Sequence, residues 1–90
     1  MGRSARYIPK RLGEKLKKIR LDLEIETYEE MIKRLDCPET PLHPSGIYLF
    51  EKNEREPTLN VLLKYARLAE VSIDTLVDDS INLPNKFKEK

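Results

Sequence analysis

The feature that most constrains this chain is a series of aliphatic residues at helical spacing directly after Pro9. They recur at intervals of four, three and four residues, at Leu12, Leu16, Ile19 and Leu23. In an α-helix these intervals place side chains on one face, which becomes the buried face of an amphipathic helix. We therefore predict a first helix over about residues 9–22.

Two further helices are predicted in the middle of the chain. A capping-box pattern at Thr27 predicts a second helix over about residues 28–36, which ends before Pro38. The stretch CPETPLHPSG holds three prolines and a glycine, which disfavour regular structure until about Pro44. A third helix is then expected over about 44–52, with Ile47 and Phe50 buried.

The last two helices are predicted from their capping residues. Thr58 is expected to cap a fourth helix over about 58–70, whose inner face would consist of Leu59, Leu62, Leu63, Ala66 and Ala69. Ser72 is expected to cap a short fifth helix that contains Ile73, Leu76 and Val77. An aromatic content of 7% and only three glycines count against an all-β fold. The predicted fold is a compact all-α domain over residues 9–79, with a basic arm over 1–8 and a tail over 80–90.

Charge is unevenly distributed, although the formal net charge is only +1. Residues 1–20 carry eight basic groups against one acid, whereas residues 21–85 carry six basic and fourteen acidic groups. Lys15, Lys17 and Lys18 fall outside the apolar face of the first helix. Basic segments commonly contact phosphate, so if DNA is bound we expect the arm and first helix to supply most phosphate contacts.

Several classes of site are disfavoured by the composition. Cys37 is the one cysteine, which excludes an internal disulfide and fits a reducing compartment. One cysteine and one histidine (His43) cannot form a closed zinc site, and no cofactor or small-molecule ligand is indicated. No apolar segment of about 18 residues could span a membrane, so a cytoplasmic location is expected.

The strings LGEKLKKIR, TYEEMIKRL and IYLFEKNEREPTLNVLLKYARLAEVSIDTL share the spacing of a known family. Over about residues 10–78 the chain resembles the Cro and phage-repressor-like helix-turn-helix proteins, often called the XRE family. The resemblance implies a lambda-repressor-like domain of five helices, in which the second and third form the helix-turn-helix. The third would lie in the major groove of duplex DNA, with a homodimer on a two-fold site.

The resemblance also implies roles for individual residues. The groove-facing residues would be Tyr28, Ser45, Tyr48 and Leu49. The DNA backbone would be approached by Lys52, Asn53 and Arg55, and further phosphate or minor-groove contacts would come from Arg3, Arg6, Lys10 and Arg11. Arg20 in the first helix would form a structural ion pair with Glu51 at the end of the third.

Two departures from the family leave a second function open. The connection before the third helix is longer than the tight turn of a helix-turn-helix. The third helix also carries Tyr48 and Leu49 where base-reading arginine, asparagine or glutamine would be efficient. The alternative is therefore a helix-turn-helix-shaped protein-interaction module that does not read bases, with Tyr48 and Leu49 as the partner site. No phosphate loop or nucleophile–base pair indicates an enzyme.

Overall fold

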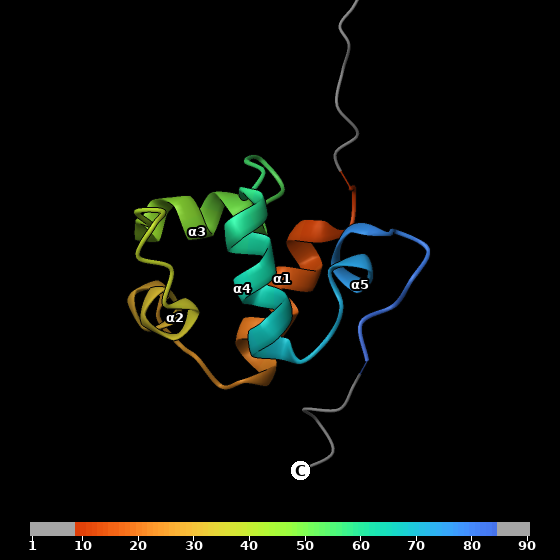
Figure 1. The fold of residues 1–90 in the computed structure, drawn as a ribbon, viewed down its shortest axis with the longest axis horizontal. Coiled ribbons are helices and arrows are strands. Elements are labelled where there is room, and N and C mark those ends of the chain that lie inside the picture. The colour runs from red at the N-terminus through yellow and green to blue at the C-terminus, as the bar shows by residue number, and fades with distance from the viewer. Residues whose placement is uncertain (1–8, 85–90) are drawn as a thin grey trace, which may run out of the picture.

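The computed structural model describes residues 9–84, and within that range the chain forms five helices and no strand (Figure 1). In chain order the helices are α1 (Leu12–Asp22), α2 (Tyr28–Leu35), α3 (Pro44–Glu51), α4 (Leu59–Ala69) and α5 (Ile73–Val77). The first four lie within three residues of their predicted bounds, and α5 contains the three residues expected in the fifth helix, so the prediction of a compact all-helical domain is confirmed. The largest difference is the start of α1, which is predicted near Pro9 and lies at Leu12.

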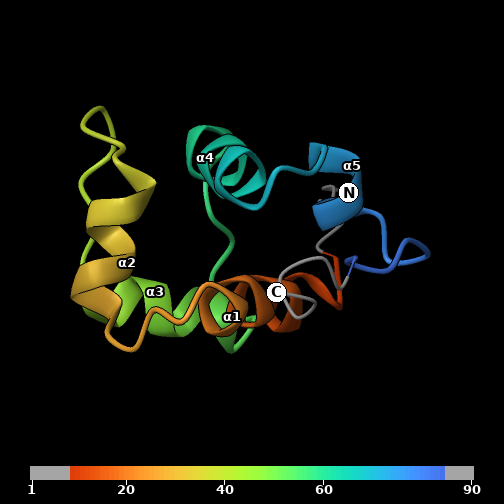
Figure 2. The ribbon, with the colours of Figure 1, turned by 90° about the horizontal axis from the view of Figure 1, so that it is seen from below.

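The helices pack around one core, with α4 across from α1 and α3 (Figure 2). Helix α2 closes one end of the molecule and packs against α3 and α4, whereas α5 closes the other end against α1 and α4. Each helix therefore contacts at least two others. This arrangement leaves one side of α3 without a covering helix in the described part of the chain.

All three predicted side-chain caps are present. The hydroxyl of Thr27 accepts from Glu30 N at 3.1 Å, that of Thr58 from Val61 N at 3.4 Å, and that of Ser72 from Thr75 N at 3.3 Å. Each satisfies one of the backbone N–H groups that have no partner at a helix start. These caps explain why the starts of α2, α4 and α5 are readable from sequence.

The buried face of α4 differs from the prediction. Leu62, Ala66 and Ala69 are buried as expected, but Leu59 is 69% exposed and Leu63 is only half-buried. The centre of the face is Tyr65, which is completely buried. Leu59 and Leu63 lie at or beyond the edge of the arc around Tyr65, because successive helical residues turn by about 100°.

The start of α1 is capped by a residue far away in the chain. Arg11, the N-cap residue, makes no side-chain cap of its own. Instead the two carboxylate oxygens of Asp79 accept from Lys10 N and Arg11 N, each at 3.0 Å. Arg11 returns a bond from its guanidinium to the Asp79 carbonyl at 2.8 Å. The segment after α5 is thereby fastened to α1.

Lys15 reinforces this connection, in contrast to the prediction that it lies outside the apolar face. It is 2% exposed, and its Nζ donates to the carbonyls of Thr75 at 2.7 Å and Asp78 at 3.0 Å. Its position three residues after Leu12 and four before Ile19 places it on the buried face. Burial lowers the pKa of the Lys15 ammonium below its ordinary value.

The packed domain continues past residue 79, where the tail was expected to begin. Leu83 is 8% exposed and belongs to the core cluster.

Within residues 9–84 no helix has the length and apolar composition needed to cross a lipid bilayer.

Candidate nucleic-acid interface

A buried ion pair fixes the end of α3 to α1. Arg20 and Glu51, paired in the sequence interpretation, meet through two nearly parallel bonds, Nε to Oε2 at 2.7 Å and Nη2 to Oε1 at 3.1 Å. The two side chains are only 8% and 3% exposed. The remaining guanidinium nitrogen, Nη1, donates to the Ile25 carbonyl at 3.1 Å. The bonds and charge of Glu51 raise the pKa of Arg20 above its ordinary value.

A row of stacked side chains continues from this ion pair to the surface. The Arg20 guanidinium carbon lies 4.9 Å from the centre of the Tyr28 ring, at the start of α2. The Tyr28 and Tyr48 rings meet edge to face, with centroids 6.3 Å apart and an interplanar angle of 63°. The Lys52 ammonium lies 5.7 Å from the Tyr48 ring centre. Cation–π and edge-to-face contacts thus join residues of α1, α2 and α3.

One face of α3 points away from the core, and we call it the α3 stripe. Its members are Ser45, Tyr48, Leu49 and Lys52. Their spacing of three, four and seven residues places them on the same side of the helix. Tyr48 is 45% exposed, Leu49 is half-buried, and Ser45 and Lys52 are exposed.

Arg55 adds positive charge beside this stripe. Its Nη1 lies 3.7 Å from the position that a Cβ on Gly46 would occupy. The guanidinium therefore reaches back along α3 from the loop that follows it. Lys52 and Arg55 are both exposed, so the stripe has a cation on it and another near its edge.

Asn53, which was predicted to approach a DNA backbone, makes hydrogen bonds within the fold. Its Oδ1 accepts from Gly13 N at 3.0 Å, and its Nδ2 donates to the Pro9 carbonyl at 3.2 Å. The residue has a φ of 63°, in the left-handed region, where asparagine is more readily accommodated than most residues. Asn53 ends α3 and holds the start of α1 next to it.

Gly13 allows α1 and α3 to approach closely at this junction. A Cβ at this position would lie 2.7 Å from the Glu51 carbonyl oxygen and 2.9 Å from that of Phe50. Side chains do not occupy such short distances to backbone atoms. The glycine inside the α1 pattern is therefore required by packing, not by the conformation of the helix.

Many cations of the first helix are used inside the molecule. Lys15 and Arg20 are buried, Arg11 bonds Glu14 and the Asp79 carbonyl, and Lys18 pairs with Asp22 at 2.7 Å. Lys10 and Lys17 remain exposed. Arg11, which was predicted to contact DNA, has its guanidinium engaged in bonds within the chain. Arg3 and Arg6, also predicted to contact DNA, lie outside the described residues.

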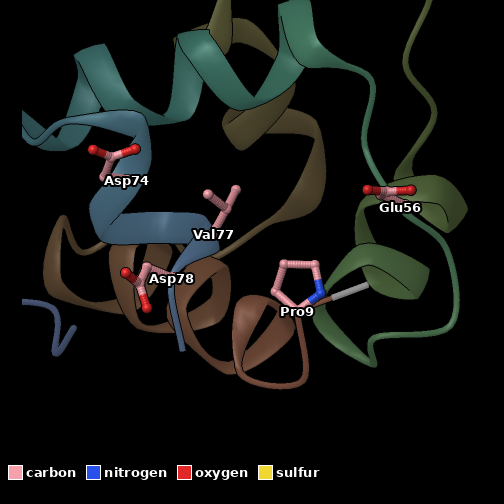
Figure 3. A pocket seen from close by; sticks show the side chains of 5 residues that line it. All are labelled: Pro9, Glu56, Asp74, Val77 and Asp78. Atoms are coloured by element: carbon pink, nitrogen blue, oxygen red, sulfur yellow. The ribbon is translucent and has the colours of Figure 1, made fainter. Parts of the chain in front are cut away.

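A hollow of about 530 Å³ lies on another part of the molecule, between the segment before α1, the loop after α3, and α5 (Figure 3). It is lined by Pro9, Val77 and the acidic residues Glu56, Asp74 and Asp78. Its carboxylates would repel phosphate. The α3 stripe, not this hollow, is the candidate nucleic-acid interface.

The sequence interpretation places Tyr28, Ser45, Tyr48, Leu49, Lys52 and Arg55 at one interface, and the structure brings them to α3 or its immediate surroundings. The sequence interpretation did not identify Asp79 as the cap of α1, nor Arg20 as a residue that packs on the Tyr28 ring. Asp79 is distant in the chain from Lys10 and Arg11, and Arg20 and Tyr28 lie on different helices, so helical spacing indicates neither contact. Comparison with protein-family models, with curated proteins and with solved structures gives no significant match.

Proposed function

We propose that the protein binds duplex DNA as a transcriptional regulator of the XRE helix-turn-helix type. In this proposal α2 and α3 form the helix-turn-helix, and the α3 stripe enters the major groove. The observation that carries the proposal is the stripe itself, a solvent-facing side of α3 that bears hydroxyl, apolar and cationic groups. An eight-residue connection, from Asp36 to His43, replaces the usual tight turn.

The chemistry around α3 supports contact with both the groove and the backbone of DNA. Ser45 offers a hydroxyl that can donate or accept at base edges, and Tyr28 offers another at the start of α2. Lys52 and Arg55 supply positive charge for phosphate oxygens on either side of a groove. A helix with these groups on one face is matched to the major groove in both charge and size.

The ion pair removes an electrostatic objection to this interface. Glu51 lies at the end of α3, where a free carboxylate would repel phosphate. Its side chain is 3% exposed and its charge is balanced by Arg20. Of the two acids in the loop directly after α3, Glu54 is exposed and Glu56 is half-buried, and Lys52 and Arg55 flank Glu54 in the chain.

The test is selection from a pool of randomised duplexes, followed by titration of the selected duplex across a salt series. The affinity should fall linearly with the logarithm of salt concentration, because bound cations release counterions from phosphate. Replacing Lys52 and Arg55 by glutamine should reduce the salt slope by about one for each lost phosphate contact. A palindromic selected sequence would support the proposed homodimer, because operator symmetry mirrors protein symmetry.

Arg67→Gln is the matched control, because Arg67 is an exposed cation on α4, across the core from α3. It should leave both affinity and salt slope unchanged. Absence of duplex binding at low salt would overturn the proposed function. So would an equal loss of affinity in the control and in the α3 variants.

A second candidate function rests on the exposure of Tyr48. At 45% exposed and beside Leu49, it gives α3 an apolar surface that a protein partner could cover. A protein-interaction module would show weak, sequence-independent DNA retention. In that case Tyr48→Ala would abolish partner binding, whereas the Lys52 and Arg55 variants would have little effect.

A further inference from the structure

The α3 stripe has an unusual composition for a surface that contacts base pairs. Discrimination among bases commonly uses the bidentate bonds of arginine to guanine or of asparagine and glutamine to adenine. None of these residue types occurs among Ser45, Tyr48, Leu49 and Lys52. The centre of the stripe is instead formed by an aromatic ring and a leucine.

The position of Lys52 leaves this apolar centre as the part nearest the bases. Lys52 follows the last residue of α3, and its ammonium lies 5.7 Å from the centre of the Tyr48 ring. In a helix-turn-helix the N-terminal residues of the recognition helix contact base edges, while later residues approach the backbone. Ser45, Tyr48 and Leu49 therefore form the base-facing part.

Tyr48 is held in place before any ligand binds. Its ring is fixed at the edge of Tyr28, which lies against Arg20, and Arg20 is held by the buried carboxylate of Glu51. The exposed ring thus has an aromatic neighbour in Tyr28 and a cationic neighbour in Lys52. A pre-positioned apolar surface loses little conformational entropy when it contacts a ligand.

We infer that Tyr48 and Leu49 recognise the 5-methyl groups of thymines in the major groove. This inference rests on the proposed function and specifies its ligand as duplex DNA with thymines facing α3. The thymine methyl is the apolar group that a base pair presents in the major groove, and its natural partner is an apolar side chain. Burial of one methyl group should change affinity about fourfold.

The experiment replaces each thymine of the selected duplex, one at a time, by deoxyuridine. Deoxyuridine keeps every hydrogen-bonding group of thymine and lacks only the methyl. We expect the affinity to fall about fourfold at each thymine that Tyr48 or Leu49 contacts, and to be unchanged at thymines elsewhere.

Two variants connect the effect to the residues. Leu49→Ala and Tyr48→Ala should each abolish the difference in affinity between thymine and deoxyuridine at the positions that the replaced side chain contacts. Lys52→Gln should weaken binding of the thymine and deoxyuridine duplexes equally. Thermal unfolding of each variant checks that the domain is folded. If the Leu49→Ala variant does not fold, the Tyr48→Ala variant alone provides the test.

The outcomes separate the inference from the proposed function. Specific binding that is insensitive to every deoxyuridine substitution overturns the inference and leaves DNA binding intact. A pattern of thymine sensitivity that is unchanged at every position in both alanine variants also overturns it. Failure to bind any duplex overturns the proposed function and the inference together.

Discussion

Removal of the Glu51 carboxylate should destabilise the domain more than removal of any surface acid. Glu51→Ala leaves the Arg20 guanidinium, 8% exposed, without its bonds at 2.7 and 3.1 Å. Breaking a buried ion pair from one side costs about 3–5 kcal/mol, because a charge stays buried without its partner. Arg20 keeps its bond to the Ile25 carbonyl and its contact with Tyr28, so we expect the lower end, about 3 kcal/mol.

For a domain of this size, a loss of that free energy should lower the melting temperature by roughly 12–24 °C. Far-ultraviolet circular dichroism would follow thermal and urea unfolding of the wild type and the variant. Glu54→Ala is the matched control, because Glu54 is an exposed acid three residues later in the chain. Its effect should stay within about 0.5 kcal/mol.

A double-mutant cycle distinguishes the ion pair from general packing. The cycle measures Arg20→Met, Glu51→Leu and the variant with both substitutions. The double variant should cost less stability than Glu51→Leu alone, because no buried charge remains. A Glu51→Ala effect as small as that of Glu54→Ala would refute the reasoning. So would strict additivity of the two single effects.

Two other substitutions test the packing at α1 and in the core. Gly13→Ala should lower stability by several kcal/mol, as severe overpacking does, because the added Cβ would lie 2.7 Å from the Glu51 carbonyl oxygen. Urea unfolding measures this loss of stability, and an unchanged stability would contradict the close approach of α1 and α3. Tyr65→Phe should raise stability by about 1 kcal/mol, because the buried hydroxyl of Tyr65 has no hydrogen-bond partner among the described residues. Burial raises the pKa of Tyr65, so above pH about 10 the folded state keeps a proton that the unfolded state releases, and wild-type stability should fall by about 1.4 kcal/mol per pH unit relative to the variant. If the difference in unfolding free energy between the two proteins stays constant from about pH 8 to about pH 11, this proton linkage is contradicted.

The positions of the helices could be predicted because their signals are local. The hydroxyls of Thr27, Thr58 and Ser72 each accept from the backbone N–H three residues later, and these caps lie where the sequence indicates. Apolar spacing also identified most of the core. Apolar spacing predicts burial less well at a position such as Tyr65, because a tyrosine carries a polar group and its residue type does not indicate whether it is buried.

The roles of Asn53 and Asp79 were less predictable, because their side chains bond partners far along the chain. Nothing near Asn53 in sequence indicates that its amide bonds Gly13, and nothing near Asp79 indicates that it caps α1. Lys15 is a different case, since its spacing from Leu12 and Ile19 did place it on the buried face. Lys15 was predicted to lie outside the apolar face because its side chain is charged, although its spacing indicated burial.

The fate of the basic residues changes where DNA contact is expected. The high positive charge of residues 1–20 suggested that this segment would supply most phosphate contacts. Within α1, however, Lys15 and Arg20 are buried and Lys18 is paired with Asp22. Lys15 and Arg20 hold α1 to α5 and α3, and the charge of Lys18 is partly balanced by Asp22. In the proposed complex, Lys52 and Arg55 therefore carry more of the contact than the charge distribution along the chain indicates.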